Sequence, residues 1–284
     1  MFSRNNKKLV WLLISLMIMS LWLAACGSDE TTDASNQAAK NENAANAPEE
    51  TEAPTEKKLT DALGNEVTIL ADPQRIIASY LEDHLAALGV KPIAQWSVAN
   101  GVQDYLKETL EGIPTIPYDL PFEAVTSFNP DLIIVGSTST VEGEKYAQYA
   151  KIAPTYSLGD EINADWRKSL LKIGEVLGKS EEAQKAFDVY EVKAKEAKEE
   201  LQGSASGQSA AAIWLVQKNF YVVSDKLSSG AVIYNDLGLS VPEVVKEISA
   251  AGTSNWNAIS LEKLAELDAD HLFLINSDNR LRIA

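Results

Sequence analysis

Near the middle of the chain, apolar side chains recur at the spacing of a helix with one buried face. The positions that form the first stripe, at i, i+4, i+7 and i+11, are Trp166, Leu170, Ile173 and Leu177. Gly178-Lys179 interrupts the pattern, and Ser180, followed by two glutamates, is typical of a new helix N-cap. The second stripe consists of Ala183, Phe187, Tyr190, Ala194, Ala197 and Leu201. We therefore predict two consecutive helices between about residues 163 and 202, the second roughly 30 Å long.

Short apolar runs alternate with helical segments on both sides of this region. Before it we predict a hairpin over 59–70, strands over 75–79, 92–96 and 131–135, and helices over 82–88, 103–110 and 122–128. After it we predict strands over 210–216, 221–223 and 271–275, and helices over 230–237 and 261–267. Strands that are buried on both faces and alternate with helices favour a parallel α/β sheet. The sequence thus predicts two α/β lobes, residues 58–162 and 206–284, on either side of a cleft, joined by bridging helices over 163–205.

The first 25 residues have the pattern of an export signal. Arg4, Lys7 and Lys8 precede a 17-residue run from Leu9 to Ala25 in which only two serines are polar. The motif that follows, Leu23-Ala24-Ala25-Cys26-Gly27, resembles a bacterial lipobox. The resemblance implies cleavage before Cys26 and lipid on its thiol and amine. The alternative is a transmembrane anchor, since 17 apolar residues is at the low edge of a span.

Residues 26–57 do not have the composition of a folded segment. From Gly27 the segment is rich in Ala, Asn, Glu and Thr, and residues 27–56 carry eight acids against one lysine. Such a stretch cannot bury a core, because it holds no large apolar side chain. We expect a flexible, self-repelling tether that holds the folded part away from the membrane.

Composition excludes several classes of function. A net charge of −16 argues against a nucleic-acid partner, because phosphate binding needs clustered Lys and Arg. One cysteine and two histidines leave little for disulfides, zinc or cysteine catalysis. We expect no resident metal or cofactor. A lipid-anchored hydrolase is the alternative class, but no Gly-x-Ser-x-Gly, His-Glu-x-x-His or phosphate-loop pattern is present.

A short pattern occurs twice, 139 residues apart. Phe122-Glu123 precedes Asp131 and an apolar strand, and Leu261-Glu262 precedes Asp270 and another. In both copies the glutamate stands eight residues before the aspartate. The echo supports two related halves, although any helix–loop–strand unit could produce it.

The order of these features resembles one family, the iron-siderophore substrate-binding lipoproteins of Gram-positive ABC importers, and most of all their ferric-citrate and hydroxamate type. The segments that carry the resemblance are the lipobox, the acidic tether, Asp72-Pro-Gln-Arg-Ile-Ile77, Leu88-Gly-Val-Lys-Pro92, Asn129-Pro-Asp-Leu-Ile-Ile134 and the bridging helix. The resemblance covers roughly residues 58–278. It implies two Rossmann-like lobes joined by a rigid helix, a ferric siderophore as cargo, and a monomer anchored outside the cytoplasmic membrane. It also implies that Glu123 and Glu262, one on each lobe, dock on arginines of the permease. The alternative is that both are solvated helix-start acids.

Ligands of open α/β sheets bind beyond the carboxyl ends of the strands. The residues placed there are Ser79, Tyr80, Trp96, Ser137 and Thr138 in the first lobe and Gln217, Lys218 and Asn276 in the second. Arg167 is the first choice for a cargo contact, because a guanidinium matches carboxylate or hydroxamate oxygens and the family often has an arginine there. Trp96 is the second choice for a cargo contact, and Tyr80 and Trp166 come after it. Ser137 and Lys218 complete the predicted site. The alternative for Arg167 is an arginine on the helix surface without a ligand, and the alternative for the tryptophans is packing in the core.

Two questions stay open at this point. Haem and cobalamin are rival cargoes, and Tyr80 would be the haem ligand. The end of the chain, Asn279-Arg-Leu-Arg-Ile-Ala284, follows no helix or strand pattern, whereas members of the resembled family continue beyond the last strand. We therefore expect a truncated second lobe with exposed apolar side chains between Leu272 and Ile275 and with lower stability.

Overall fold

The computed structural model describes residues 55–99, 101–252 and 254–277. The signal segment, Cys26, nearly all of the tether and the last seven residues lie outside the described residues. Within the described ranges, no helix combines the length and the hydrophobicity that a membrane span requires. The description below therefore concerns the α/β part of the chain.

The N-terminal part contains a hairpin and two small parallel sheets. Strands β1 (Glu56–Thr60) and β2 (Glu66–Leu70) form the antiparallel hairpin expected over 59–70. The three-stranded parallel sheet has the order β3-β6-β7 and comprises Ile76–Ile77, Leu132–Val135 and Thr155–Ser157. A separate parallel pair consists of β4 (Gln95–Ser97) and β5 (Thr115–Pro117). The predicted parallel arrangement is confirmed for this part of the chain, although β5 and β7 were not predicted.

Strand β6 is buried on both faces. Leu132 and Ile134 belong to one apolar cluster, with residues of β3, α2 and α6, and Ile133 and Val135 belong to another, with residues of α3 and α4. Successive side chains of a strand point to opposite faces, so an all-apolar strand can contribute to two cores at once. The near-continuous apolar run of β6 is thus explained by its central position.

Short helices surround these sheets. The α-helices are α2 (Glu82–Ala87), α3 (Phe122–Ser127), α4 (Lys145–Tyr149) and α5 (Asp160–Asn163), and the 3₁₀ turns are η1 (Asp104–Leu106) and η2 (Thr138–Val141). The helix predicted over 103–110 is wrong in type and length, since only the three residues of η1 are helical. Gly112, which follows with φ of 78°, ends the turn region and allows the chain to enter β5.

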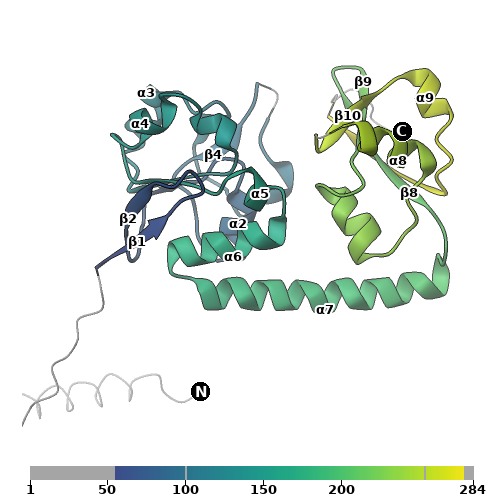
Figure 1. Ribbon diagram of the computed structural model, residues 1–284, viewed down its shortest axis with the longest axis horizontal. Coiled ribbons are helices and arrows are strands. Elements are labelled where there is room, and N and C mark those ends of the chain that lie inside the picture. The colour runs from purple at the N-terminus through teal and green to yellow at the C-terminus, as the bar shows by residue number, and fades with distance from the viewer. Residues whose placement is uncertain (1–54, 100, 253, 278–284) are drawn as a thin grey trace, which may run out of the picture. The chain divides into compact units, whose positions relative to one another are not determined.

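The two consecutive helices predicted from the apolar stripes are present. Helix α6 (Trp166–Leu177) begins after Asp165, whose carboxylate accepts the backbone N–H groups of Arg167 and Lys168. It ends at Gly178, whose φ of 71° is the left-handed conformation of a helix C-cap. Helix α7 (Ser180–Ser204) is the longest in Figure 1. Its N-cap is Lys179 and not Ser180, and no side chain caps it, so that detail of the prediction is wrong.

Helices α6 and α7 approach each other closely at one glycine. A Cβ atom on Gly174 would lie 2.5 Å from the Cβ of Ala183, and Ala183 is the buried residue of α7. The contact requires a small residue on both sides. Most of the remaining surface of α7 is partly or fully exposed, which agrees with its many Lys and Glu residues.

The C-terminal part contains a four-stranded mixed sheet. Its order is β10-β9-β8-β11, comprising Trp256–Ile259, Asn219–Val223, Ala210–Val216 and His271–Asn276. Strand β9 is antiparallel to both of its neighbours, and only β8 and β11 are parallel. A wholly parallel sheet is therefore wrong here: Gln217 and Lys218, with φ of 51° and 65°, make the tight hairpin that reverses the chain.

Three helical segments accompany this sheet. They are η3, a π-helix over Ala231–Asp236, α8 (Glu243–Ala251) and α9 (Leu261–Ala265). Strand β10 and helix α8 were not predicted. On the sheet itself, Trp214 and Trp256 stack with ring centroids 5.2 Å apart, and Tyr221 meets Trp256 edge-on. The α/β fold class is confirmed, while the predicted lobe boundaries stay predictions.

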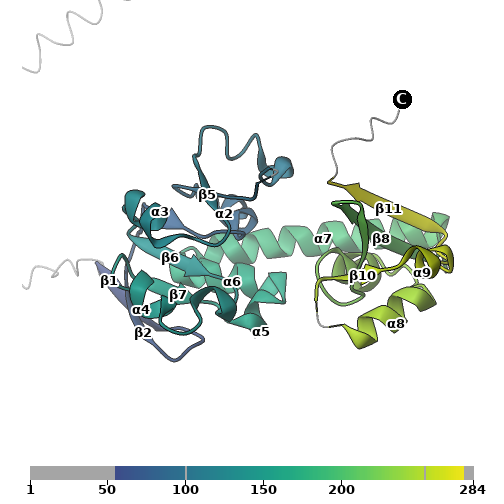
Figure 2. The ribbon, with the colours of Figure 1, turned by 90° about the horizontal axis from the view of Figure 1, so that it is seen from above.

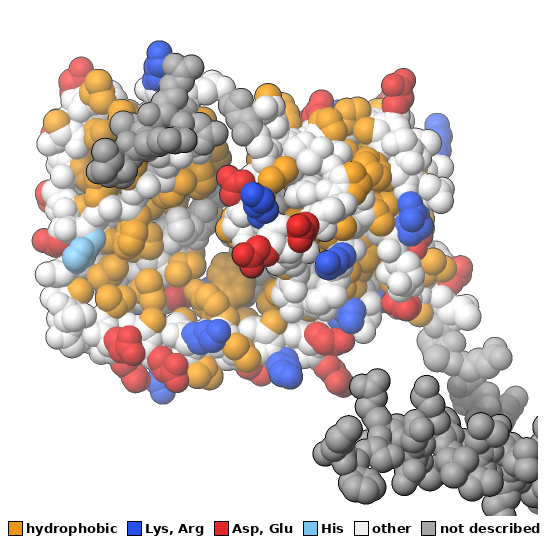
Figure 3. Space-filling model, turned by 180° about the vertical axis from the view of Figure 1, so that it is seen from behind, with side chains coloured by type: hydrophobic (Ala, Val, Ile, Leu, Met, Phe, Trp, Pro, Cys, Tyr) orange, Lys and Arg blue, Asp and Glu red, His pale blue; other side chains and the backbone are white. Residues whose placement is uncertain are grey.

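Strand β11 exposes a run of large apolar side chains. Leu272, Phe273 and Leu274 are 57%, 51% and 50% exposed, and the described part of the chain pairs β11 only with β8. Figure 2 shows β11 along the outer side of β8, and Figure 3 shows apolar side chains spread over the face of this C-terminal part. The expected exposure is confirmed for these three residues. An apolar strand with an open edge invites pairing with another chain.

We predict that Leu272→Lys raises the concentration at which the isolated protein begins to aggregate, because a charge on an edge strand opposes edge-to-edge pairing. The measurement is light scattering across a protein concentration series, with thermal unfolding in parallel. Val192→Lys on α7 is the matched control, since Val192 is also 57% exposed. Equal association of Leu272→Lys and the original protein, or an equal reduction by Val192→Lys, would contradict the prediction.

Candidate ligand-binding site

Tyr80, which lies beyond the carboxyl end of β3, forms an aromatic pair with Trp96 of β4. Tyr80 follows β3 and Trp96 lies in β4, and their ring centroids are 5.1 Å apart. Tyr80 adopts a φ of 65°, a left-handed conformation that is uncommon for a residue with a bulky side chain, and it is 57% exposed. The structure thus brings together two of the predicted site residues and leaves one of them accessible to solvent.

A buried carboxylate holds this pair in place. Glu82, the first residue of α2, is fully buried, and its Oε1 accepts the backbone N–H of Trp96 at 2.6 Å. Burial raises the pKa of Glu82, although backbone N–H groups of Trp96, Glu82 and Tyr80 partly oppose that shift. Sequence reasoning missed this role, because an acid in the first turn of a helix is ordinarily a solvated residue. Only the complete burial of Glu82 distinguishes the two cases.

Arg167 lies in the first turn of α6 between two carboxylates. Its Nη2 is 2.7 Å from Oδ1 of Asp236 in η3, and its Nε donates to Oε1 of Glu191 in α7 at 2.9 Å. The guanidinium also lies over the rings of Trp166 and Tyr190, at 4.5 and 5.3 Å from their centroids. The side chain of Arg167 keeps 26% of its surface exposed. It is therefore held rigidly but remains partly accessible.

Asp236 connects three helices through one carboxylate. Its Oδ1 accepts from Arg167, and its Oδ2 accepts the hydroxyl of Tyr190 at 2.6 Å. Only 9% of its side chain is exposed. Neither Asp236 nor Tyr190 was predicted as a site residue, because the periodicity of α7 assigns Tyr190 to a packing face and the sequence around Asp236 carries no motif.

Trp166 has one unsatisfied polar group. Its ring meets that of Tyr190 edge-on at 4.4 Å, and its indole Nε1 is buried with no hydrogen-bond acceptor among the described residues. A buried donor without an acceptor is uncommon and calls for an explanation such as an ordered water or a ligand. Trp166 and Arg167, two predicted site residues, are thus adjacent in space as well as in sequence.

Ser137 belongs to a different hydrogen-bond network. Its hydroxyl donates to Oδ1 of Asp160 at 2.8 Å, and Thr138 contributes its backbone N–H and hydroxyl to the same carboxylate. Hydrogen bonds from Thr138 and Ser137 lower the pKa of Asp160. Ser137 therefore connects the turn between β6 and η2 to the first residue of α5. The last predicted residue, Lys218, lies exposed in the β8–β9 hairpin.

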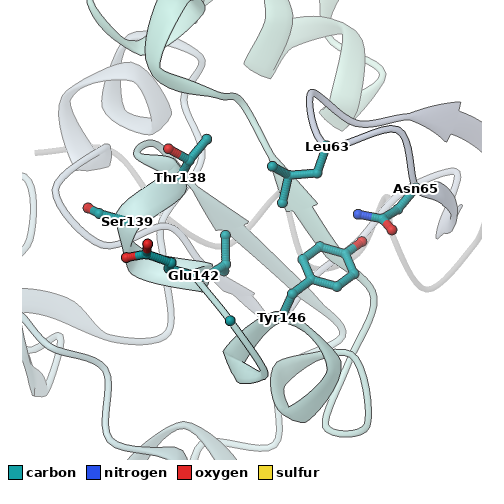
Figure 4. Close-up of a pocket in the computed structure, with 8 residues that line it drawn as sticks. Leu63, Asn65, Thr138, Ser139, Glu142 and Tyr146 are labelled. Carbon is teal, nitrogen blue, oxygen red and sulfur yellow. The ribbon is translucent and has the colours of Figure 1, made fainter.

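A pocket of about 540 Å³ lies next to this network. Its lining includes Leu63 and Asn65 from the β1–β2 turn, Thr138 and Ser139 from η2, and Tyr146 from α4. Figure 4 shows these side chains arranged around the pocket, with the hydroxyl of Tyr146 on the side of Asn65. No lysine or arginine lines this pocket. An anionic cargo would therefore find no positive charge in it, and the Arg167 region is the better candidate.

Glu123 and Glu262 occupy equivalent positions in the two parts of the chain. Each is exposed in the first turn of a short helix, α3 or α9, that leads to a strand of a parallel pair. Asp131, eight residues after Glu123, accepts the backbone N–H groups of Gln74 and Arg75 at 2.8 and 2.9 Å, just before β3.

Asp270 repeats this arrangement before β8. Its carboxylate accepts the backbone N–H of Ser209 at 2.7 Å, and these bonds lower its pKa. In both parts an aspartate before one strand thus fixes the start of its parallel neighbour. The echo seen in the sequence therefore corresponds to a repeated hydrogen-bond arrangement, which independent helix–loop–strand units would not be expected to share.

Comparison with known proteins gives a consistent result. The family model described as periplasmic binding protein matches residues 79–282. The iron-uptake system-binding protein of Bacillus subtilis is 30% identical over 96% of this chain and 81% of its own length. The iron(3+)-hydroxamate-binding protein YxeB of the same organism is 26% identical over 94% and 78%.

A solved structure gives the same fold. The triscatecholate siderophore binding protein FeuA of Bacillus subtilis, complexed with ferri-bacillibactin, superposes with a TM-score of 0.62 at 25% identity, over 78% of this chain and 77% of that one. The family comprises binding components of ABC uptake systems, which are not enzymes. The family match, the relatives and the α/β fold agree, and the chain belongs to the periplasmic binding protein family.

Proposed function

We propose that this protein captures a ferric siderophore, of the ferric-citrate or hydroxamate type, and delivers it to the permease of an ABC importer. It works outside the cytoplasmic membrane as a monomer that is anchored by lipid on Cys26. The single observation that carries the proposal is the 30% identity, over nearly the whole chain, to an iron-uptake system-binding protein. The hydroxamate-binding relative supports the choice of cargo.

The chemistry around Arg167 suits such a cargo. Ferric siderophores present several oxygens around the metal and often carry negative charge. A guanidinium offers five N–H donors in a planar fork, and Arg167 uses only part of them on Asp236 and Glu191. The rings of Trp166 and Tyr190 pre-organise it, so a cargo would gain hydrogen bonds without ordering a free side chain.

Arg167 carries one positive charge and pairs with two carboxylates, so the cluster of Arg167, Asp236 and Glu191 has a net negative charge. An anionic cargo must therefore compete with Asp236 and Glu191 for the guanidinium, or bind to the N–H groups that they leave free. This competition limits affinity for the anion. It also keeps the partly buried guanidinium paired while the site is empty, which avoids the cost of an unpaired charge.

Tryptophan fluorescence of residues 27–284 tests the cargo directly. We expect saturable quenching by ferric citrate or a ferric trihydroxamate, because Trp96 and Trp166 lie among the proposed contacts. A ferric catecholate and haem are titrated in parallel. Saturation by haem alone would overturn the proposal. Saturation by the catecholate alone would support ferric-siderophore binding, but it would show that the cargo is a catecholate.

Arg167 and Asp236 should have opposite effects on affinity. Arg167→Ala removes charge-assisted hydrogen bonds worth about 1.5–3 kcal/mol each, which corresponds to roughly ten- to hundredfold weaker binding of an anionic ferric complex. Asp236→Asn removes a competing charge and should tighten binding severalfold. Both affinities come from the fluorescence titration.

Arg167→Lys is the matched control for charge, because it keeps the cation but lacks the planar fork. Circular dichroism establishes that each variant is folded. Unchanged affinity in Arg167→Ala would show that Arg167 is not a cargo contact.

Replacing Cys26 tests the anchor. In cells that express the full chain, Cys26→Ala removes the lipid acceptor, and a protein without its lipid cannot stay attached through that chain. We expect the variant to leave the membrane fraction, whereas the unaltered protein incorporates radiolabelled palmitate. A variant that remains in the membrane fraction would indicate a transmembrane anchor and contradict the lipoprotein proposal.

A further inference from the structure

Among the described residues, no strand pairing joins the two strands that lead to Tyr80 and Trp96. Strand β3 belongs to the β3-β6-β7 sheet, whereas β4 pairs only with β5. One backbone hydrogen bond, from Ile93 to Ile76 at 2.9 Å, connects the two segments, but it lies several residues before either aromatic ring. The distance between the rings therefore depends on a further contact.

Glu82 supplies this contact from the beginning of α2. Its Oε1 accepts the backbone N–H of Trp96 at 2.6 Å, and the backbone N–H groups of Tyr80 and of Glu82 itself lie near the same carboxylate and favour its ionised form. One carboxylate thus faces the backbone of both aromatic residues. Tyr80 has a φ of 65°, a conformation that costs energy for a bulky residue and persists only where neighbouring contacts hold it.

The burial of Glu82 does not by itself call for a carboxylate. Its Oε2 is buried and has no hydrogen-bond partner among the described residues, and the same holds for the hydroxyl oxygen of Ser79 in the same β3–α2 connection. An apolar side chain would fill this volume without leaving a buried oxygen unsatisfied. The carboxylate is explained by the N–H groups that it faces, and above all by that of Trp96.

The charge of Glu82 is linked to these N–H groups. Burial raises the pKa of its carboxyl, and the backbone N–H groups of Trp96, Glu82 and Tyr80 oppose that shift. The other titratable groups that act on it are Asp83 of α2, Tyr80 and Tyr105 of η1, none of which is a cation. Ionised Glu82 is therefore stabilised by backbone N–H groups, and its ionisation and the position of those groups depend on each other.

Helix α2 also contacts the first turn of α6. Burial lowers the pKa of His84, and a hydrogen bond to the backbone of Trp166 opposes that shift. Arg167, the next residue of α6, is already paired with two carboxylates. One short helix thus contacts both parts of the proposed site, the aromatic pair through Glu82 and the Arg167 region through His84.

We propose that Glu82 is a positioning residue of the cargo site. Its carboxylate sets the distance between the turn that carries Tyr80 and the strand that carries Trp96, and it thereby shapes the aromatic surface that the cargo contacts. Glu82 is fully buried, so it acts through these two residues and does not touch the cargo. The inference rests on the proposed function. It implies that the aromatic pair, and with it the affinity, respond to the ionisation of Glu82.

A titration without cargo tests the positioning. Tryptophan emission of residues 27–284 is recorded from about pH 4 to pH 8, a range that spans a raised glutamate pKa. We expect the original protein to show a pH-dependent component that is absent from Glu82→Gln, which cannot ionise, and from Trp96→Phe, which lacks the reporter. Asp83→Asn is the matched control, because it removes a charge from the adjacent, exposed position and should keep the component. Identical profiles for Glu82→Gln and the original protein, or a component that survives in Trp96→Phe, would overturn the inference.

Affinity measurements connect the position of the rings with function. The Kd values of the original protein and of Glu82→Gln for ferric citrate and a ferric trihydroxamate are compared at each pH, so that protonation of the cargo cancels in their ratio. We expect Glu82→Gln to bind roughly three- to tenfold more weakly above the pKa of Glu82 and equally below it. Circular dichroism establishes that the variant is folded.

The remaining outcomes separate this inference from the proposed function. If the original protein binds a ferric complex and the ratio does not change with pH, Glu82 does not act through its charge, and the inference is overturned while the proposed function is retained. If the original protein binds neither complex nor any other ferric siderophore, the proposed function is refuted. The titration without cargo then still decides whether Glu82 positions Trp96.

Discussion

The ion pair between Arg167 and Asp236 connects the beginning of α6 with η3, and Tyr190 adds α7 to the same carboxylate. The guanidinium and the carboxylate are both partly removed from water, and their ion pair compensates each for the lost hydration. Removal of either one leaves a partly buried charge without its partner. The position of η3 against the two bridging helices thus depends on a group that is also the best candidate for contact with an anionic cargo.

Because Arg167 both joins the helices and is the candidate cargo contact, its acidic partners also determine the charge around it. Glu191 and Asp236 hold the guanidinium in one orientation, and the aromatic rings of Trp166 and Tyr190 restrict it further. A cargo bound at Arg167 as proposed would meet a donor whose geometry is fixed beforehand, so little conformational entropy would be lost on binding. The same acids weaken the attraction for an anion. Selectivity is favoured over affinity in such an arrangement, because only a ligand with correctly placed oxygens can replace the carboxylates.

The features that could be predicted from the sequence are those with a strong local pattern. The stripe from Trp166 to Leu177 and the break at Gly178 located α6 and the start of α7, because helix periodicity and glycine caps act over a few residues. Strand β6 was recognisable because burial on both faces requires an uninterrupted apolar run. The spacing from Glu123 to Asp131 and from Glu262 to Asp270 located a repeat whose hydrogen bonds the structure then supplied.

The remaining features depend on contacts between distant segments. Asp236 lies 69 residues from Arg167, and nothing in its neighbourhood marks it as a partner. Glu82 resembles any acid at a helix start until its burial is known. A strand over 221–223 was predicted, but the antiparallel direction of β9 was missed, because the reversal depends on two residues with positive φ, neither of which is a glycine. Arg167, Trp96, Tyr80, Trp166, Ser137 and Lys218 were located in the structure, but their roles in binding stay predictions.

The close contact between Gly174 and Ala183 fixes the distance between α6 and the N-terminal end of α7. At 1.5 Å per residue, the 25 residues of α7 extend about 37 Å, so a tilt of about 5° at that contact displaces the far end by about 3 Å. The two helices can approach this closely because Gly174 has no side-chain methyl group. A larger side chain at Gly174 would displace Ala183, and the resulting tilt of α7 would strain the contacts that Tyr190 and Glu191 make with Asp236 and Arg167.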